Sequence, residues 1–440
     1  MKWPVNMKPV VYILLIVLFP TPCSARNFRD LNARECVEIA LERSLFSRQI
    51  EQQATLTRSS RFAVLSTVLP QVTFASGFAR TTTTELVFDP AEGAPVPTEV
   101  AFNQYQAAFN FFLTLIDISS WVEVNQIATT KSIADATFID AKADLALRVK
   151  TAFYNLITLY NDVDVARAAQ AQIQQQVQIA GELLRLGTIA RPELLRLEVA
   201  LIQQRVEAIR AAQTLQNQLG SFGDLIGVAQ PFSIDTAVSF PDTRTPIPDP
   251  DTLRKVAVQK NPSLRVSLLR ADNQRAAASA VRLSRIPTVS LSFAYGYSAP
   301  EMFTGLGSWR ENDFWNLGVT LTVALFEGLQ WRGQMQKTAA NAALAQIDLK
   351  ITENSVMEQL NSAYTNLQAN REALLLIPDL LRAAEEELRL VQEQFRLGAA
   401  SSLDILQSQS SFSQARQQST AIISSFYQAE ALLLRLMGQW

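Results

Sequence analysis

The stretch 289–297, VSLSFAYGY, alternates strictly between large apolar side chains and small ones. Strict alternation with a period of two is the pattern of a β-strand that presents one face to an apolar environment. Three further stretches alternate in the same way, at 71–78, 105–115 and 315–325, the second with Phe112 as its exception. Each has about ten residues, the length that crosses a bilayer as a tilted strand. We therefore predict four membrane-spanning strands.

The two faces of these strands differ in chemistry. The second face carries small, uncharged side chains. Aromatic residues gather toward the strand ends, at Tyr105, Tyr295, Tyr297, Phe314 and Trp315. An aromatic girdle around an apolar band is typical of outer-membrane barrels, whose external loops are long, and the segments 81–102 and 299–313 have loop composition. A soluble β-sandwich is the alternative, but four strands are few for a sandwich inside so helical a chain.

Four strands per chain cannot close a barrel, because the smallest closed membrane barrels have eight. An open edge in lipid would leave backbone groups without hydrogen-bond partners. The barrel must therefore be shared, and two copies give eight strands while three give twelve. Eight-stranded barrels are filled by side chains, whereas the small residues of the second face favour an open lumen, so we expect three copies.

The rest of the chain is predicted to be helical. Residues 122–186 are rich in Ala, Gln and Leu and fit a single helix of about 90 Å. Residues 331–397 mirror them, with Pro378 as the one breaker, and return helices are expected at 192–220 and 402–438. Helices of this length cannot enclose a compact core and are expected to lie against one another as antiparallel coiled coils.

The chain repeats itself, since matched motifs stand in the same order at nearly constant separation. They include LPQ at 69–71 with IPT at 286–288, and RLG at 185–187 with RLG at 396–398. We predict a first structural repeat at 26–240, a Pro-rich linker at 241–250 and a second repeat at 251–440.

Residues 1–25 are predicted to be a signal peptide, because two lysines accompany the apolar run 10–19 and small residues end at Ala25. That run is about half the length of a membrane-spanning helix. Lipidation at Cys23 is the alternative, although a proline precedes it where such sites have a small residue. Cleavage after Ala25 leaves Cys36 as the last cysteine, which excludes an internal disulfide and makes Cys36 a predicted core residue.

Composition argues against several classes of function. The chain has no histidine, which removes His-based general-base catalysis and the commonest metal ligand. Its two cysteines cannot supply the four thiolates of a structural zinc site. A net charge of −2 offers no basic face for nucleic acid. We expect no enzyme activity, no cofactor, no metal and no nucleic-acid partner.

The order of these elements, and three motifs within it, resemble the TolC-like outer-membrane factor family over nearly the whole chain after the signal peptide. The motifs are LPQ at 69–71, LFEG at 325–328 and FRLGAASSLDIL at 395–406. The resemblance implies a mainly α fold with membrane β-structure, in which long antiparallel coiled-coil helices form an α-barrel below a shared 12-stranded β-barrel. It also implies a homotrimer in the bacterial outer membrane, in contact with its lipid and extending into the periplasm.

The function implied is a passive exit duct of a tripartite efflux pump or a type I secretion system. Its implied partners are a periplasmic adaptor protein and an inner-membrane transporter. The cargo and the transporter class are not readable from the sequence. The alternative is a periplasmic or surface coiled-coil structural protein without a channel.

The Arg-Leu-Gly turns correspond to the periplasmic tips at which members of this family meet their adaptors. The docking residues implied by the resemblance are Leu184, Arg185, Leu186, Gly187, Thr188, Phe395, Arg396, Leu397, Gly398 and Ala399. A glycine that only caps the end of a helix is the alternative interpretation.

Glu193 and Asp404 occupy equivalent positions just beyond the two tips and are the implied acidic gate. In a trimer they would give six carboxylates near the tunnel mouth, which favour cations. Acids in the first turn of a helix are also stabilised by its dipole, which is the alternative. Gln407 and Ala400 stand where family members have a second acid and a locking arginine, and Arg191 lies near the equivalent place in the first tip. The sequence therefore does not show which residues would lock a closed entrance.

Overall fold

The computed structural model describes residues 29–90, 93–237, 240–241, 247–283, 285–302 and 305–439. The predicted signal peptide lies outside these residues, as do positions 242–246 of the predicted linker.

Two series of elements follow one another in the same order of helix, helix, strand, strand, long helix and return helix. The first series is α1 (Ala33–Arg43), α2 (Leu45–Ser66), β1 (Gln71–Asp89), β2 (Ala94–Ile116), α3 (Ile118–Arg185) and α4 (Arg191–Ile226). The second is α5 (Pro250–Lys260), α6 (Pro262–Leu283), β3 (Thr288–Ala299), β4 (Asp313–Thr322), α8 (Gln330–Arg396) and α9 (Ser402–Leu436). The short helix α7 (Leu306–Glu311) is inserted between β3 and β4.

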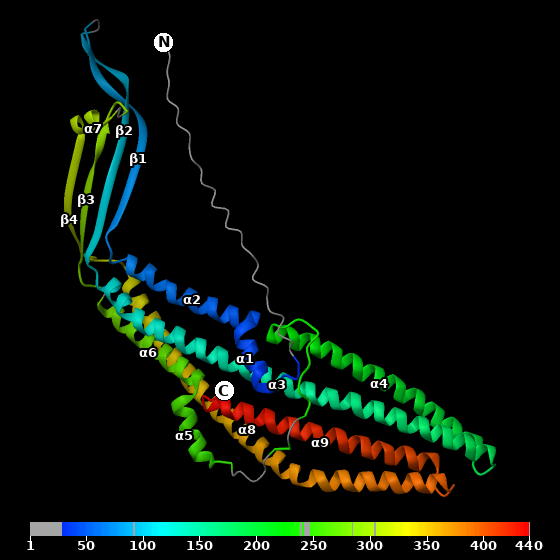
Figure 1. Cartoon of the computed structure of the whole chain (residues 1–440). Coiled ribbons are helices and arrows are strands. Elements are labelled where there is room, and N and C mark those ends of the chain that lie inside the picture. Colours follow the sequence, from blue (N-terminus) through cyan, green and yellow to red (C-terminus); the bar gives the residue numbers. More distant parts are fainter. Residues whose placement is uncertain are drawn as a thin grey trace, which may run out of the picture.

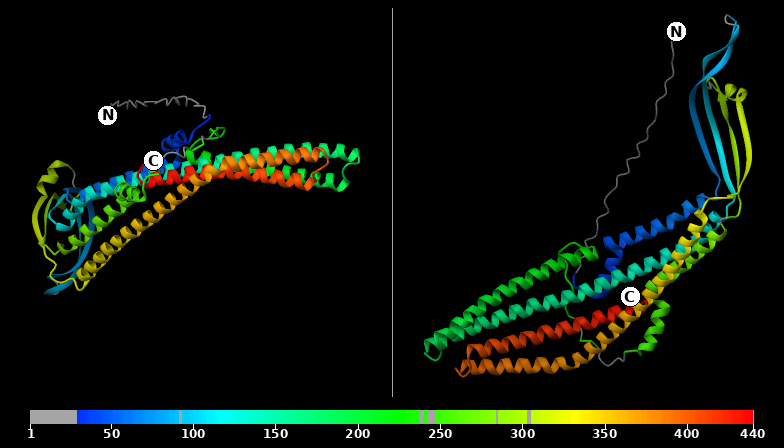
Figure 2. Two further views of the ribbon diagram at one scale, coloured as in Figure 1. Left: turned by 90° about the horizontal axis from the view of Figure 1, so that it is seen from below. Right: turned by 180° about the vertical axis from the view of Figure 1, so that it is seen from behind.

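The molecule is elongated, with the sheet at one end and two helical hairpin tips at the other (Figure 1). The helices α3 and α8 have 68 and 67 residues, so each is about 100 Å long. The return helices α4 and α9 have 36 and 35 residues and run back beside them (Figure 2). The predicted long coiled-coil helices are confirmed.

None of the described helices combines the length and the hydropathy needed to cross a membrane.

The described strands form one antiparallel sheet in the order β1-β2-β3-β4. The register places the predicted apolar faces on the same side, since Phe74 pairs with Phe109, which in turn pairs with Tyr295. Tyr295 pairs with Trp315 of β4. The rings of Phe74 and Phe109 lie 4.8 Å apart between centroids. The four predicted strands are therefore confirmed, with one continuous apolar face.

The first hairpin is much longer than predicted, and the long loop expected at 81–102 is wrong. Strands β1 and β2 stay paired out to Asp89 and Ala94, through Pro95 and Pro97 of β2. Strand β3 pairs with β2 only from Tyr105 onward. Beyond that point one edge of β2 has no described partner, so a proline without an N–H group breaks no ladder there. The expected loop at 299–313 contains α7, and β4 ends at Thr322 rather than 325.

Pro378 does not break the second long helix, contrary to the sequence-based expectation. The helix α8 continues through it from Gln330 to Arg396. A proline removes one backbone hydrogen bond, whereas Leu374 and Ile377 in the adjacent turn are buried and hold the helix in place.

The core has two main clusters, one in each half. The first includes Cys36, Leu156 and Phe222, and the second includes Leu360 and Leu436. Cys36 is fully buried, as predicted, and burial raises the pKa of its thiol to about 12. A thiol in this environment is protonated at neutral pH and therefore inert.

Polar contacts join the two halves along α3 and α9. The hydroxyl of Thr158 donates to Ser424 Oγ at 2.9 Å, and Gln428 Nε2 donates to Asn155 Oδ1 at 2.8 Å. Beside them the ring of Tyr154 stacks on a tyrosine of α9, with centroids 4.9 Å apart. Polar pairs of this kind help to fix which residues of two helices lie opposite each other.

Candidate functional site

The two hairpin tips end in the same backbone motif. In the first tip the N–H of Thr188 donates to the carbonyl of Leu183 at 2.9 Å, around Gly187 with φ +76°. In the second the N–H of Ala399 donates to the carbonyl of Gln394 at 2.8 Å, around Gly398 with φ +74°. This is the Schellman arrangement, and glycine adopts its left-handed residue without strain.

A small apolar cluster fastens the two tips to each other. It consists of Ala180, Leu197, Phe395 and Ile405, which come from α3, α4, α8 and α9. Phe395 is 1% exposed, so its side chain supports the turn from within rather than lying on the surface of the tip. The two hairpins of one chain therefore meet as a single unit at this end.

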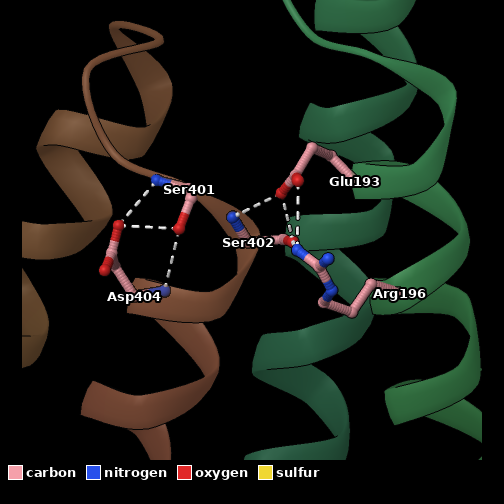
Figure 3. A network of polar contacts seen from close by, with 5 residues as sticks. All are labelled: Glu193, Arg196, Ser401, Ser402 and Asp404. Carbon is pink, nitrogen blue, oxygen red and sulfur yellow. Dashed lines mark hydrogen bonds and ion pairs between the residues drawn. The ribbon is translucent and has the colours of Figure 1, made fainter.

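Glu193 links the two hairpins through a polar contact beside this cluster (Figure 3). Its Oε2 accepts from the backbone N–H of Ser402 at 3.0 Å and also from the hydroxyl of Ser402. Arg196 Nη1 lies 3.0 Å from Glu193 Oε1 and 3.1 Å from Ser402 Oγ. Ser402 is the first residue of α9 and is fully buried. Glu193 thus satisfies an N-terminal donor of the neighbouring helix, not of its own.

Asp404 makes its contacts within its own helix. Ser401 is the N-cap of α9, and its side chain and that of Asp404 form a capping box. The backbone N–H of Ser401 donates to Asp404 Oδ2 at 2.9 Å, and the N–H of Asp404 donates to Ser401 Oγ at 3.3 Å. The carboxylate is otherwise exposed at the tip (Figure 3).

Both carboxylates are held in the ionised form. The hydrogen bonds from Ser402, aided by Arg196, lower the pKa of Glu193. The hydrogen bonds from Ser401 lower the pKa of Asp404. Each residue is the third of its return helix, so their positions are equivalent, as the sequence suggested. Their contacts are not equivalent, because only Glu193 bridges to the other hairpin.

Sequence reasoning missed Ser402 and Arg196 as partners of Glu193. The three-residue spacing of Glu193 and Arg196 is a recognisable helical ion pair. No local signal marks Ser402, which lies 209 positions further along the chain.

The outermost surface of the tips is apolar and basic. Leu186 is 69% exposed and Leu397 is 83% exposed, each directly after an exposed arginine. Arg185 pairs with Glu182 at 2.9 Å, and Arg396 lies 3.7 Å from Glu393. An apolar centre with a polar rim is the usual composition of a protein–protein interface.

In the described part of the chain, no group of His, Cys, Asp and Glu side chains is arranged to hold a metal ion.

The chain is similar to known outer-membrane proteins. Residues 253–439 match the family model described as outer membrane efflux protein. The proteases secretion protein PrtF of Dickeya chrysanthemi is 24% identical over 340 residues, covering 76% of this chain and 72% of PrtF. The outer membrane protein TolC of Vibrio cholerae is 22% identical over 347 residues, covering 78% of this chain and 75% of TolC. The solved CmeC outer membrane channel of Campylobacter jejuni has the same fold, with a TM-score of 0.78 at 15% identity over 93% of this chain and 86% of CmeC.

Proposed function

Since the chain belongs to the outer membrane efflux protein family, we propose that three copies form an exit duct across the outer membrane and periplasm. The protein is a conduit of the outer membrane and not an enzyme, which removes the alternative of a coiled-coil protein without a channel. The observation that carries the proposal is a sheet with one continuous apolar face that leads directly into two long helical hairpins. Conductance of the purified protein in planar bilayers tests it.

Three copies per duct are supported by the edges of the sheet. Strands β1 and β4 each have one edge with no partner among the described residues, and such edges are not tolerated in lipid. Pairing β4 of one copy with β1 of the next closes the sheet into a barrel. Three copies give twelve strands, which leaves a lumen, whereas eight strands would be filled by side chains.

We infer that the chain arose by duplication, with repeats at 26–240 and 251–440 joined by the Pro-rich linker 241–250. The repeated element order and the matching apolar cores support this division. In a trimer, the two hairpins of each chain would then give six nearly equivalent hairpins around one axis.

Glu193 and Asp404 are proposed as the acidic ring at the periplasmic entrance. Both lie at the tips and both are ionised. Arg196 neutralises part of the charge of Glu193, whereas Asp404 forms no ion pair with a described residue. Asp404 is therefore expected to supply most of the field that attracts cations.

Replacing both acids, in the variant Glu193→Ala with Asp404→Ala, should lower the cation selectivity of the channel. The reversal potential in a salt gradient should move toward zero, and Asp404→Ala alone should cause most of the movement. Glu38→Ala, in α1 and far from the tips, is the control and should change nothing. An unchanged reversal potential in the double variant would exclude the acidic ring.

The tips are proposed as the docking surface for a periplasmic adaptor protein, which would connect the duct to an inner-membrane transporter. The exposed leucines at 186 and 397, with the arginines before them, supply apolar contacts and charge. Gly187 and Gly398 keep both turns sharp, while Leu184, Thr188 and Ala399 complete the surface. Phe395 contributes from beneath by holding the second turn in place.

A further inference from the structure

The short helix α7 covers part of the apolar face of the sheet, at the end of β3 farthest from the long helices (Figure 1). The ring of Trp309 lies 6.4 Å from that of Tyr295 and 5.8 Å from that of Tyr297, between centroids. Tyr297 is 1% exposed, and its hydroxyl donates to the carbonyl of Glu301 at 2.5 Å. The aromatic contacts therefore fix α7 to the sheet.

A cavity of about 550 Å³ lies between α7 and the sheet. Its wall consists of Phe109, Tyr295, Gly307, Trp309 and Arg310. Three of these residues supply aromatic rings, and none supplies a carboxylate. A space of this size with apolar walls and one charged group is typical of a ligand site.

Among the described residues of the wall, Arg310 is the one that carries a charge. Its side chain is exposed and forms no ion pair with another described residue. The adjacent Glu311 is not part of the wall. A guanidinium group beside apolar surface is suited to a phosphate or carboxylate, because its N–H groups bind two oxygens at once.

The cavity opens on the side of the sheet that meets lipid. Phe109 and Tyr295 belong to the continuous apolar face, and they are directly paired across β2 and β3. These are the two central strands of the sheet. In the proposed barrel neighbouring copies would pair along β1 and β4, so assembly would leave the cavity uncovered.

The position along the membrane follows from the direction of the helices. The long helices extend from the end of the sheet opposite to α7 (Figure 1). Because the proposed duct places these helices in the periplasm, α7 would lie at the level of the outer leaflet. Trp315 and Phe314 stand at the same end of β4, where aromatic residues mark the membrane–water interface. An arginine at this depth reaches the level of lipid head groups.

We propose that this cavity binds a phosphate-bearing lipid of the outer leaflet, one molecule per chain. An acyl chain would lie against Phe109, Tyr295 and Trp309, and the phosphate would accept hydrogen bonds from Arg310. The proposal rests on the proposed function, because it requires the sheet to be part of a barrel wall in the membrane.

The test titrates the delipidated trimer with lipid A carrying its phosphates and follows the bound mass by native mass spectrometry. We expect up to three lipids per trimer, and about tenfold weaker binding for Arg310→Gln, since a charge-assisted contact is lost. Arg310→Lys keeps the charge and should retain most of the affinity. Arg205→Gln is the matched control, because Arg205 is an exposed arginine of α4, far from the sheet.

A second comparison uses dephosphorylated lipid A, so that the protein and the lipid are each changed in turn. The unaltered protein should bind dephosphorylated lipid A about tenfold more weakly than phosphorylated lipid A. The variant Arg310→Gln should bind the two lipids equally well. Equal binding of phosphorylated lipid A to the unaltered protein and to Arg310→Gln would overturn the proposal. So would displacement of the lipid by inorganic phosphate alone, since the apolar wall would then be irrelevant. The conductance of the same preparations is measured as well. Normal conductance without lipid binding would overturn only the lipid site, whereas absent conductance would contradict the proposed duct.

Discussion

Val319→Arg should prevent the protein from entering the outer membrane. Val319 lies near the middle of β4, is 67% exposed in the single chain and pairs with Leu291 on the apolar face. An arginine on the lipid face of a membrane barrel costs about 2–4 kcal/mol at the midplane. In the proposed barrel three copies contribute one arginine each, so the trimer would lose about 6–12 kcal/mol, which is comparable to the whole stability of many proteins.

The matched control for this variant is its neighbour, Thr320→Arg. Thr320 points to the opposite, small-residue face and pairs with Ser290. This variant should insert normally and shift the selectivity of the channel toward anions, because it adds positive charge to the lumen. Membrane fractionation and trimer content measure both outcomes. If Val319→Arg inserted as well as Thr320→Arg, the apolar face would not be the lipid face.

Phe395→Ala should loosen the entrance at the helical tips. Phe395 is 1% exposed and packs with Leu197 and Ile405 in the cluster that joins the two hairpins. Removing a buried phenylalanine side chain costs about 3–5 kcal/mol. The cluster is small and separate from the two main cores, so the lost free energy weakens the contact between the hairpins and leaves the main cores intact. We expect a larger and more variable unitary conductance, without loss of the trimer.

Leu397→Ala is the control for the entrance. Leu397 is two residues further on and 83% exposed, so its truncation creates no cavity. The conductance of the isolated channel should stay unchanged, although binding of an adaptor at the tips would weaken. Phe395→Leu should preserve most of the closed state, because it keeps much of the buried volume. An unchanged conductance in Phe395→Ala would show that the cluster does not hold the entrance.

The alternation of side chains was enough to find all four strands, because a sheet with one face in lipid must repeat every two residues. The segment 81–102 was instead predicted to be a loop from its composition, which includes Pro95 and Pro97, and that prediction is wrong. Proline excludes a central strand but not a strand with a free edge, and the sequence does not say how far β3 reaches along β2. The helix through Pro378 was missed for a similar reason, since tertiary packing outweighs one lost hydrogen bond.

The positions of the two acids could be read from the repeat, but their roles in the fold could not. The capping box of Asp404 has a local signature, because Ser401 precedes it by three residues. The bridge from Glu193 to Ser402 depends on how two hairpins lie side by side, which no spacing along the chain records. The helix α7 was also not predicted, because its segment has the composition of a loop. Its contacts with Tyr295 and Tyr297 depend on the folded sheet and leave no pattern in the sequence.

The most direct test of the proposed duct is single-channel recording from the purified protein in planar bilayers. We expect the protein to require detergent, to purify as a trimer, and to give discrete, cation-selective conductance steps. These steps should disappear for Val319→Arg, since that variant is not expected to form a barrel in lipid. Purified protein that stays dispersed without detergent, or that gives no conductance in any bilayer, would contradict a duct formed by three copies of this chain.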